Sequence, residues 1–103
     1  MITLREAVAR ATDYVVSAYK GSGVNIQDVL LEEAELSDNQ QIWLITIGFS
    51  VERSMTARTR MEATAAMLRG EINLERIYKL VHVNAETGEV QSMKMRLVTP
   101  YVG

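Results

Sequence analysis

The fold of this chain is decided by the stretch Tyr78-Lys79-Leu80-Val81-His82-Val83-Asn84-Ala85-Glu86-Thr87-Gly88-Glu89-Val90-Gln91-Ser92-Met93-Lys94-Met95-Arg96. Two runs that alternate apolar and polar residues flank a turn sequence that ends at Gly88, and a period of two is typical of strands with one buried face. The turn holds turn-forming side chains, and its glycine can take a positive φ. The stretch therefore predicts a β-hairpin, whose strands we place at about 74–84 and 88–97.

The N-terminal residues predict an α-helix over about 3–20. Thr3 and Glu6 have the spacing of a capping box, in which the threonine hydroxyl accepts a hydrogen bond from an amide of the first turn. Apolar residues then recur at helical spacing, and Gly21 suits the position after the last turn. The residues expected to face the sheet are Leu4, Val8, Ala11, Val15 and Ala18, with Ala7, Thr12 and Tyr19 beside them.

Two further strands are predicted between the helix and the hairpin. Residues 25–36 admit either a short helix or a strand, and we favour a strand over about 29–36 because a short turn at Asp38 leads directly into the next strand. That second strand covers about 41–51 and alternates along its whole length. The side chains expected to pack on the helix are Trp43, Ile45, Ile47, Phe49 and Val51.

An insertion over about 52–73 separates the second and third strands, where ordinary hairpin connections have about two to five residues. The insertion mixes helix-weakening Ser and Thr with Ala, Met and Leu, so we expect a helical piece near 57–69, ended by Gly70. Connections of this length are often functional, although tolerated surface loops are as common.

Together these elements predict the fold class α+β, as a single domain over 1–103. One N-terminal helix packs on a four-stranded antiparallel meander sheet, with a partly helical insertion between strands 2 and 3. Of the 103 residues, 48% are hydrophobic and 23% are charged, which is typical of one globular core. Neither a secretory signal pattern nor an apolar run of membrane-spanning length occurs in the sequence, so we expect a cytoplasmic protein.

The hairpin and the order of the elements resemble those of PepSY-like domains. The resemblance rests on Asn84-Ala85-Glu86-Thr87-Gly88-Glu89-Val90, which is similar to the D/N-A-x-T-G-E-V turn of that family. The broader shape is similar to cystatin-like folds. The resemblance implies a helix on a curved antiparallel sheet and a role in binding another protein, as among protease propeptides and inhibitors. This chain departs from many PepSY proteins in its insertion and in lacking an export signal.

The sequence offers few groups for catalysis or metal binding. His82 is the only histidine and there is no cysteine, so no zinc site is expected. A general base needs an orienting group that no motif supplies for His82, and we interpret it as a residue packed at the sheet surface. Phosphate-binding, nucleophile-elbow and calcium-loop motifs are absent. We therefore expect no catalytic residue, no metal and no cofactor.

Charge is unevenly distributed along the chain, although the net charge is only −2. An acidic run on the first strand is interpreted as a solvated edge, with recognition of a basic partner as the alternative. Its members are Asp28, Glu32, Glu33, Glu35 and Asp38. The insertion is locally basic, so the two regions could pair within the molecule or across a dimer.

The leading hypothesis is a non-catalytic protein-interaction module, with an inhibitory role included, that binds a partner protein or a second copy of itself. The contact would be a sheet edge, the sheet face opposite the helix, or the insertion. The candidate interaction residues are Ile42, Leu44, Arg53, Arg58, Arg60, Met61, Leu68, Arg69, Lys94 and Arg96. Ile42 and Leu44 are included because no intramolecular partner is predicted for them. Lys94 and Arg96 are included because the last strand can carry cations into solvent on one side.

Two other functions stay open. A small-ligand binder or an enzyme would use a pocket between the helix and the curved sheet, and Asp13, Tyr14 and His82 would be the residues to inspect. Nucleic-acid binding would use Arg58 and Arg60, but the net charge and the lack of aromatic residues in the insertion argue against it. No membrane contact is expected.

Overall fold

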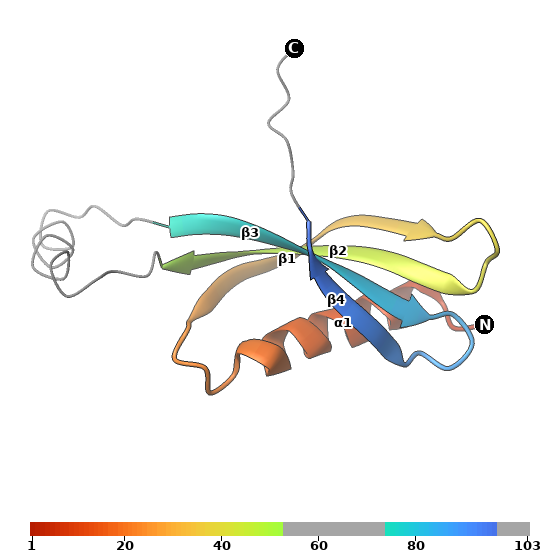
Figure 1. The fold of residues 1–103 in the computed structure, drawn as a ribbon, viewed down its shortest axis with the longest axis horizontal. Helices are drawn as coiled ribbons and strands as arrows, with labels where there is room; N and C mark the ends of the chain where they lie inside the picture. The colour runs from red at the N-terminus through yellow and green to blue at the C-terminus, as the bar shows by residue number, and fades with distance from the viewer. Residues whose placement is uncertain (53–73, 97–103) are drawn as a thin grey trace, which may run out of the picture.

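A computed structural model describes residues 1–52 and 74–96 of the chain. In this part, one helix packs on one four-stranded antiparallel sheet with the strand order β1-β2-β3-β4, which confirms the predicted α+β class (Figure 1). The elements are α1 (Leu4–Tyr19), β1 (Ile26–Leu36), β2 (Ile42–Glu52), β3 (Leu74–Asn84) and β4 (Val90–Met95). The helical piece predicted near 57–69 and most of the predicted insertion lie outside the described residues.

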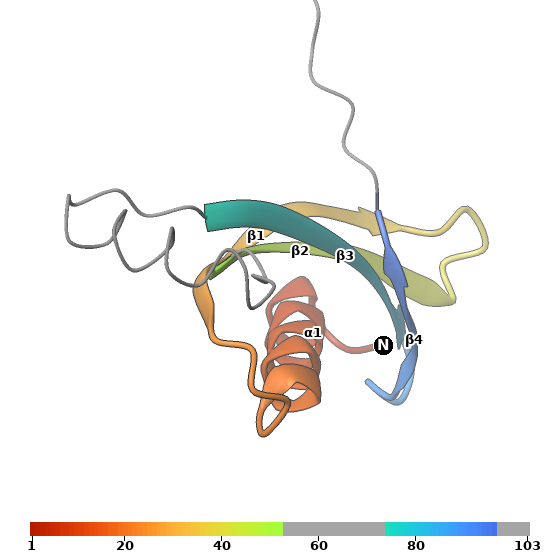
Figure 2. The same cartoon turned by 60° about the vertical axis from the view of Figure 1, so that its left-hand side comes forward.

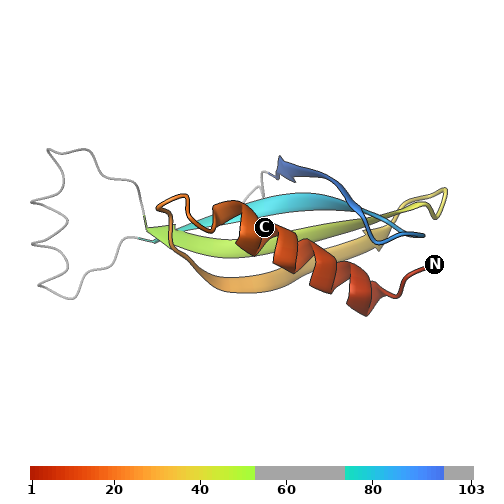
Figure 3. The same cartoon turned by 90° about the horizontal axis from the view of Figure 1, so that it is seen from below.

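The sheet is curved and α1 lies in its concave side (Figure 2). Seen from below, the helix runs along the sheet (Figure 3). The fully buried residues of α1 are the small Ala7 and Ala11 together with Val15. Small side chains let the helix backbone approach the sheet closely, so the larger residues of the core come from the strands.

Four of the five strand side chains predicted to pack on the helix are buried in the core, and Trp43 is half-buried. Ile45, Ile47 and Phe49 of β2 are fully buried, and β3 adds Val81 and Val83 beside them. The Phe49 ring meets the Tyr19 ring of α1 edge to face, with 5.1 Å between the ring centroids. Burial of such side chains stabilises by roughly 1.5 to 3 kcal/mol each before conformational entropy is subtracted. This layer is therefore the main stabilising core of the fold.

The predicted stripe of α1 was wrong at its two ends. Leu4 is 43% exposed and Ala18 is exposed, although both share a helical face with Ala11. A straight helix follows a twisted, curved sheet closely only along its middle turns, so its ends project beyond the contact. The predicted cap is present, because the Thr3 hydroxyl accepts a hydrogen bond from the Glu6 amide at 3.1 Å.

The edge strand β1 begins at Ile26, three residues before the predicted start at 29. Pairing with β2 continues through two irregularities, one between Gln27 and Leu30 and one between Leu31 and Glu33. Asp28, in the first, has a φ of 51°, a left-handed conformation that an extra residue in a β-bulge often adopts. The bulges let a sequence without strict alternation stay in the sheet.

Strand β4 is shorter than predicted and covers Val90–Met95 instead of about 88–97. Gly88, with a φ of 76°, belongs to the turn, and its amide donates to the Asn84 carbonyl at 2.8 Å. The Asn84 side-chain oxygen also accepts from the amides of Glu86 and Thr87. The turn is therefore closed by Asn84 and Gly88, the two residues that its sequence pattern emphasised.

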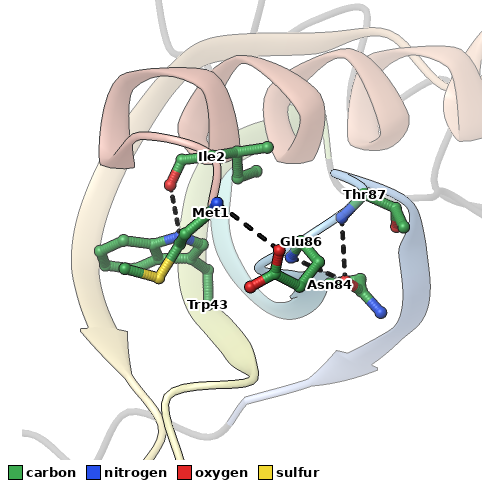
Figure 4. Close-up of polar contacts among 6 residues, drawn as sticks. All are labelled: Met1, Ile2, Trp43, Asn84, Glu86 and Thr87. Carbon is green, nitrogen blue, oxygen red and sulfur yellow. Dashed lines mark hydrogen bonds and ion pairs between the residues drawn. The ribbon is translucent and has the colours of Figure 1, made fainter.

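Residues before the helix tie this turn to β2 (Figure 4). The Ile2 amide donates to the Ala85 carbonyl at 2.6 Å, and the Trp43 indole nitrogen donates to the Ile2 carbonyl at 3.3 Å. The Met1 amino group lies 3.5 Å from a carboxylate oxygen of Glu86. The start of α1 is thereby fixed over one end of the sheet.

Candidate interaction face

The convex side of the sheet, opposite α1, carries the remaining side chains of every strand. We call this surface the helix-free face. In the strand register it contains two neighbouring rows: Glu35, Leu44, His82 and Ser92 in the first, and Glu33, Thr46, Leu80 and Lys94 in the second. Beyond them lie Gly48 and Ser50 of β2 with Tyr78 and Arg76 of β3. This face holds the candidate site residues that the structure describes.

Arg76 crosses this face from β3 to the edge strand β1. One terminal nitrogen, Nη2, donates to Glu32 Oε1 at 2.8 Å. The other, Nη1, donates to the Asp28 carbonyl at 2.7 Å and to the Ser50 hydroxyl at 3.2 Å. Because Asp28 and Glu32 lie at the two irregular points of β1, a single guanidinium holds both of them against the sheet.

The path of this bridge explains a glycine in the middle of β2. A Cβ atom at position 48 would lie 2.5 Å from Glu32 Oε1, 2.8 Å from Glu32 Cγ and 3.0 Å from Arg76 Nη2. Glycine in a strand interior is ordinarily unfavourable, because it gains no side-chain packing and loses more backbone entropy than other residues. Gly48 is therefore the position over which the Glu32–Arg76 ion pair passes.

Arg96, just after β4, forms a second bridge. Its Nη1 donates to the Thr46 hydroxyl at 2.7 Å, and its Nη2 lies 2.9 Å from Glu33 Oε2. The Arg96 side chain is 38% exposed, and it folds back over the sheet because a long guanidinium side chain at the end of an edge strand can reach an acceptor there while part of it stays in solvent. Lys94 is exposed, as predicted.

The two bridges bury polar side chains on a face over which no helix of residues 1–52 or 74–96 packs. Thr46 is 2% exposed and Ser50 is 8% exposed, although both lie on the helix-free face. Each hydroxyl accepts a hydrogen bond from an arginine, so its burial leaves no unmet polar group. The part of the face around Thr46, Gly48 and Ser50 is thus closed by the molecule's own side chains.

The rest of the face keeps accessible apolar surface. Leu44 and Leu80, on adjacent strands, are each half-buried, and so is Ile42 at the end of β2. Glu35 on β1 and Lys94 on β4 are exposed beside them. Of the ten candidate interaction residues, the structure thus brings Ile42, Leu44, Lys94 and Arg96 to this face. The others, Arg53, Arg58, Arg60, Met61, Leu68 and Arg69, lie outside the described residues.

The three residues considered for a pocket between helix and sheet do not meet there. Asp13 and Tyr14 are exposed on α1. His82 pairs with Leu44 and Ser92 in the register, which places it on the helix-free face. The space between α1 and the sheet is occupied by the apolar side chains of the core.

Within residues 1–52 and 74–96, no three His, Cys, Asp or Glu side chains are grouped so as to hold a metal ion. In the same residues, no helix is both long and apolar enough to cross a membrane.

The bridging role of Arg76 and of the hydroxyls of Thr46 and Ser50 was not predicted from the sequence. Arg76 lies 44 residues from Glu32, and Arg96 lies 50 residues from Thr46, so no local pattern links them. The one available signal was Gly48, since glycine inside a central strand often marks a close approach by another group. Comparison of the chain with protein-family models, curated proteins and solved structures finds no match.

Proposed function

We propose that this chain is a non-catalytic protein-interaction module whose contact surface is the helix-free face. The observation that carries the proposal is the accessible apolar pair Leu44 and Leu80, on the same face as the Arg76 and Arg96 bridges, whose charges are already paired within the molecule. An antiparallel sheet that faces only water usually carries polar residues on that side. Leucines in the central positions of this face indicate a surface that is buried against a partner in a complex.

Internal pairing of the arginines also favours contact with another protein. Burying an unpaired charge is costly, whereas a pair that is already hydrogen-bonded needs less compensation from the partner. Arg76 and Arg96 each satisfy a carboxylate of β1 before any partner arrives. The face can therefore be desolvated without leaving a lone guanidinium beneath the partner.

The sheet edges support the proposal less well. Strand β1 has two irregularities and exposed acidic side chains, which are features that discourage the addition of a further strand. Strand β4 has six residues and offers a short edge. Binding of another protein is also the role that the resemblance to PepSY-like domains implies, and that resemblance stays a prediction. So does the cytoplasmic location.

Substitution of one central residue tests the proposal. Leu44→Glu places a charge in the accessible apolar surface, and the matched control Val16→Glu makes a similar change on α1, where Val16 is 42% exposed. Self-association is measured by light scattering, and capture of partners is measured with tagged protein in a lysate of the native cells. We expect the Leu44 variant to lose association while the Val16 variant keeps it.

Thermal unfolding of both variants checks that the fold is retained, and Leu80→Lys repeats the test from β3 if Leu44→Glu unfolds. A wild-type protein that neither self-associates nor captures any partner would contradict the proposal. Association that survives both face substitutions would place the contact elsewhere and would also contradict it.

A further inference from the structure

We infer that the partner is a second copy of this chain, docked face to face about a two-fold axis that runs along the strands. The inference rests on the proposed function, because it names the partner of the same surface. Its starting point is the distribution of charge over the helix-free face. The acids Glu32, Glu33 and Glu35 all lie on β1, whereas the cations Arg76, Lys94 and Arg96 lie on β3 or at β4.

Arg76 and Arg96 fold back onto Glu32 and Glu33, so the charges that polarise this face across the sheet are those of Glu35 and Lys94. Glu35 and Lys94 are exposed on the two edge strands, and three strand spacings separate those strands, about 14 Å. At that distance the two side chains do not form a direct ion pair within one molecule. Leu44 lies beside Glu35 in the register and Leu80 lies beside Lys94, so the apolar pair stands between opposite charges.

Two symmetric ways of stacking such a face have opposite electrostatic consequences. In the first, the two-fold axis lies between the two faces and runs across the strands. It places β1 over β1 of the second copy, which brings acids onto acids. An axis along the strands places β1 over β4 of the second copy and β2 over β3, which brings acids onto cations. Only the second arrangement is complementary, because like charges at an interface cost affinity and opposite charges guide docking.

The register specifies the contacts of this arrangement. Glu33 lies over Lys94 of the second copy, and Glu35 lies over Ser92, two residues along β4 from that Lys94, or about 7 Å. Leu44 lies over the row of His82, and Thr46 lies over Leu80. Two symmetry-related Glu35–Lys94 pairs would then flank a centre that contains the leucines, as in interfaces with an apolar core and a charged rim. Because the face is convex, the two copies would approach to about 10 Å along β2 and β3, and the long Glu35 and Lys94 side chains would reach across the wider gap at the edge strands.

Charge reversal tests the docking geometry, because rescue of binding by mixing two variants cannot result from a change in the stability of either monomer. Glu35→Lys and Lys94→Glu each replace two attractive pairs of the symmetric dimer by two repulsive ones, and we expect each to weaken dimerisation about tenfold or more. An equimolar mixture of the two variants carries opposite charges at both contacts. The mixture should therefore form a heterodimer of about wild-type affinity, and the double variant Glu35→Lys/Lys94→Glu should recover as a homodimer.

Dissociation constants are measured by sedimentation equilibrium over a concentration series, with one chain labelled to follow heterodimers. Glu89→Lys and Arg5→Glu are matched controls, since both residues are exposed and lie in the β3–β4 turn and on α1. The controls should dimerise like wild type. Circular dichroism confirms the fold of each variant.

Wild-type dimers that are indifferent to both single reversals would overturn the docking geometry. A protein that stays monomeric at every concentration, yet captures another protein through Leu44, would overturn self-association and leave the proposed function standing. A protein with neither property would overturn both.

Discussion

The two faces of the sheet are built from alternate residues of the same strands, yet they are covered in different ways. On the concave side, α1 buries Ile45, Ile47 and Phe49 completely. On the convex side, no described element packs over the strands, and Thr46 is nevertheless 2% exposed because Arg96 lies across it. The difference shows that two long side chains can cover part of a sheet face over which no described helix or strand packs.

Removal of the largest core side chain should reveal the greatest difference between the faces. Phe49→Ala should lower the free energy of unfolding by about 3 to 5 kcal/mol, because the ring is fully buried and meets Tyr19 edge to face. Denaturant unfolding followed by circular dichroism measures the change. A loss below about 1 kcal/mol would mean that the helix-covered face is not the main core.

Loss of the first bridge should be less costly. Arg76→Ala leaves the Glu32 carboxylate and the Asp28 carbonyl without their donor, and we expect a loss of about 1 to 2 kcal/mol, since both charged side chains are partly solvated. Arg76→Lys should recover only part of it, because an ammonium group does not reproduce the fork of donors. Equal stability of wild type and the Ala variant would contradict a stabilising bridge.

A substitution at Gly48 tests whether the bridge passes over that residue. Gly48→Ala should destabilise by about 1 kcal/mol in the wild-type chain, because the new Cβ displaces the Glu32 side chain from Arg76. In a Glu32→Ala background the same change should be neutral or stabilising by about 0.5 kcal/mol, since alanine is entropically better than glycine in a strand. A double-mutant cycle measures this reversal, and equal effects in both backgrounds would argue against the crossing.

The smallest stability change is expected on the accessible part of the helix-free face. Leu44→Thr should alter the free energy of unfolding by less than about 1 kcal/mol at a concentration where the protein is monomeric, because Leu44 is half-buried and threonine suits a strand. Repeating the measurement at higher concentration should show a larger difference if the face is a contact between molecules. A large loss at low concentration would place Leu44 in the monomer core.

Elements with strong local patterns were predicted well. Strand β3 matches its predicted bounds of 74–84, and α1 agrees within one residue at each end. The turn at Asn84 and Gly88 was also predicted, since both residue types have a direct conformational role there. Alternation in β2 correctly separated its two faces. Trp43 lies on the predicted face but is half-buried and not fully buried. Trp43→Ala should therefore lower the free energy of unfolding by less than the substitution of a fully buried ring would.

The candidate site was less predictable because its contacts are long-range. Ile42 and Leu44 were recognised from alternation, which a local window contains. The contacts of Arg96 were not recognised. The sequence does not indicate whether a charged side chain at the end of a strand points to solvent or folds back over the sheet. The irregularities of β1 are also invisible in the sequence, because Asp28 and Glu32 differ in no obvious way from the acids around them.

The register between β2 and β3 has a practical consequence for protein engineering. Pairing continues to Glu52 and Leu74, so these two residues lie at directly opposed positions, about 5 Å apart. Glu52 and Leu74 lie at the end of the β2–β3 pair opposite Asn84, and therefore far from the turn whose Ala85 carbonyl accepts from the Ile2 amide. A guest sequence with neighbouring termini could be grafted between Glu52 and Leu74, and each doubling of its length would cost only about 0.6 kcal/mol in loop closure. The pair Glu52 and Leu74 thus offers an attachment point for reporters or binding tags at the end of the hairpin opposite its turn.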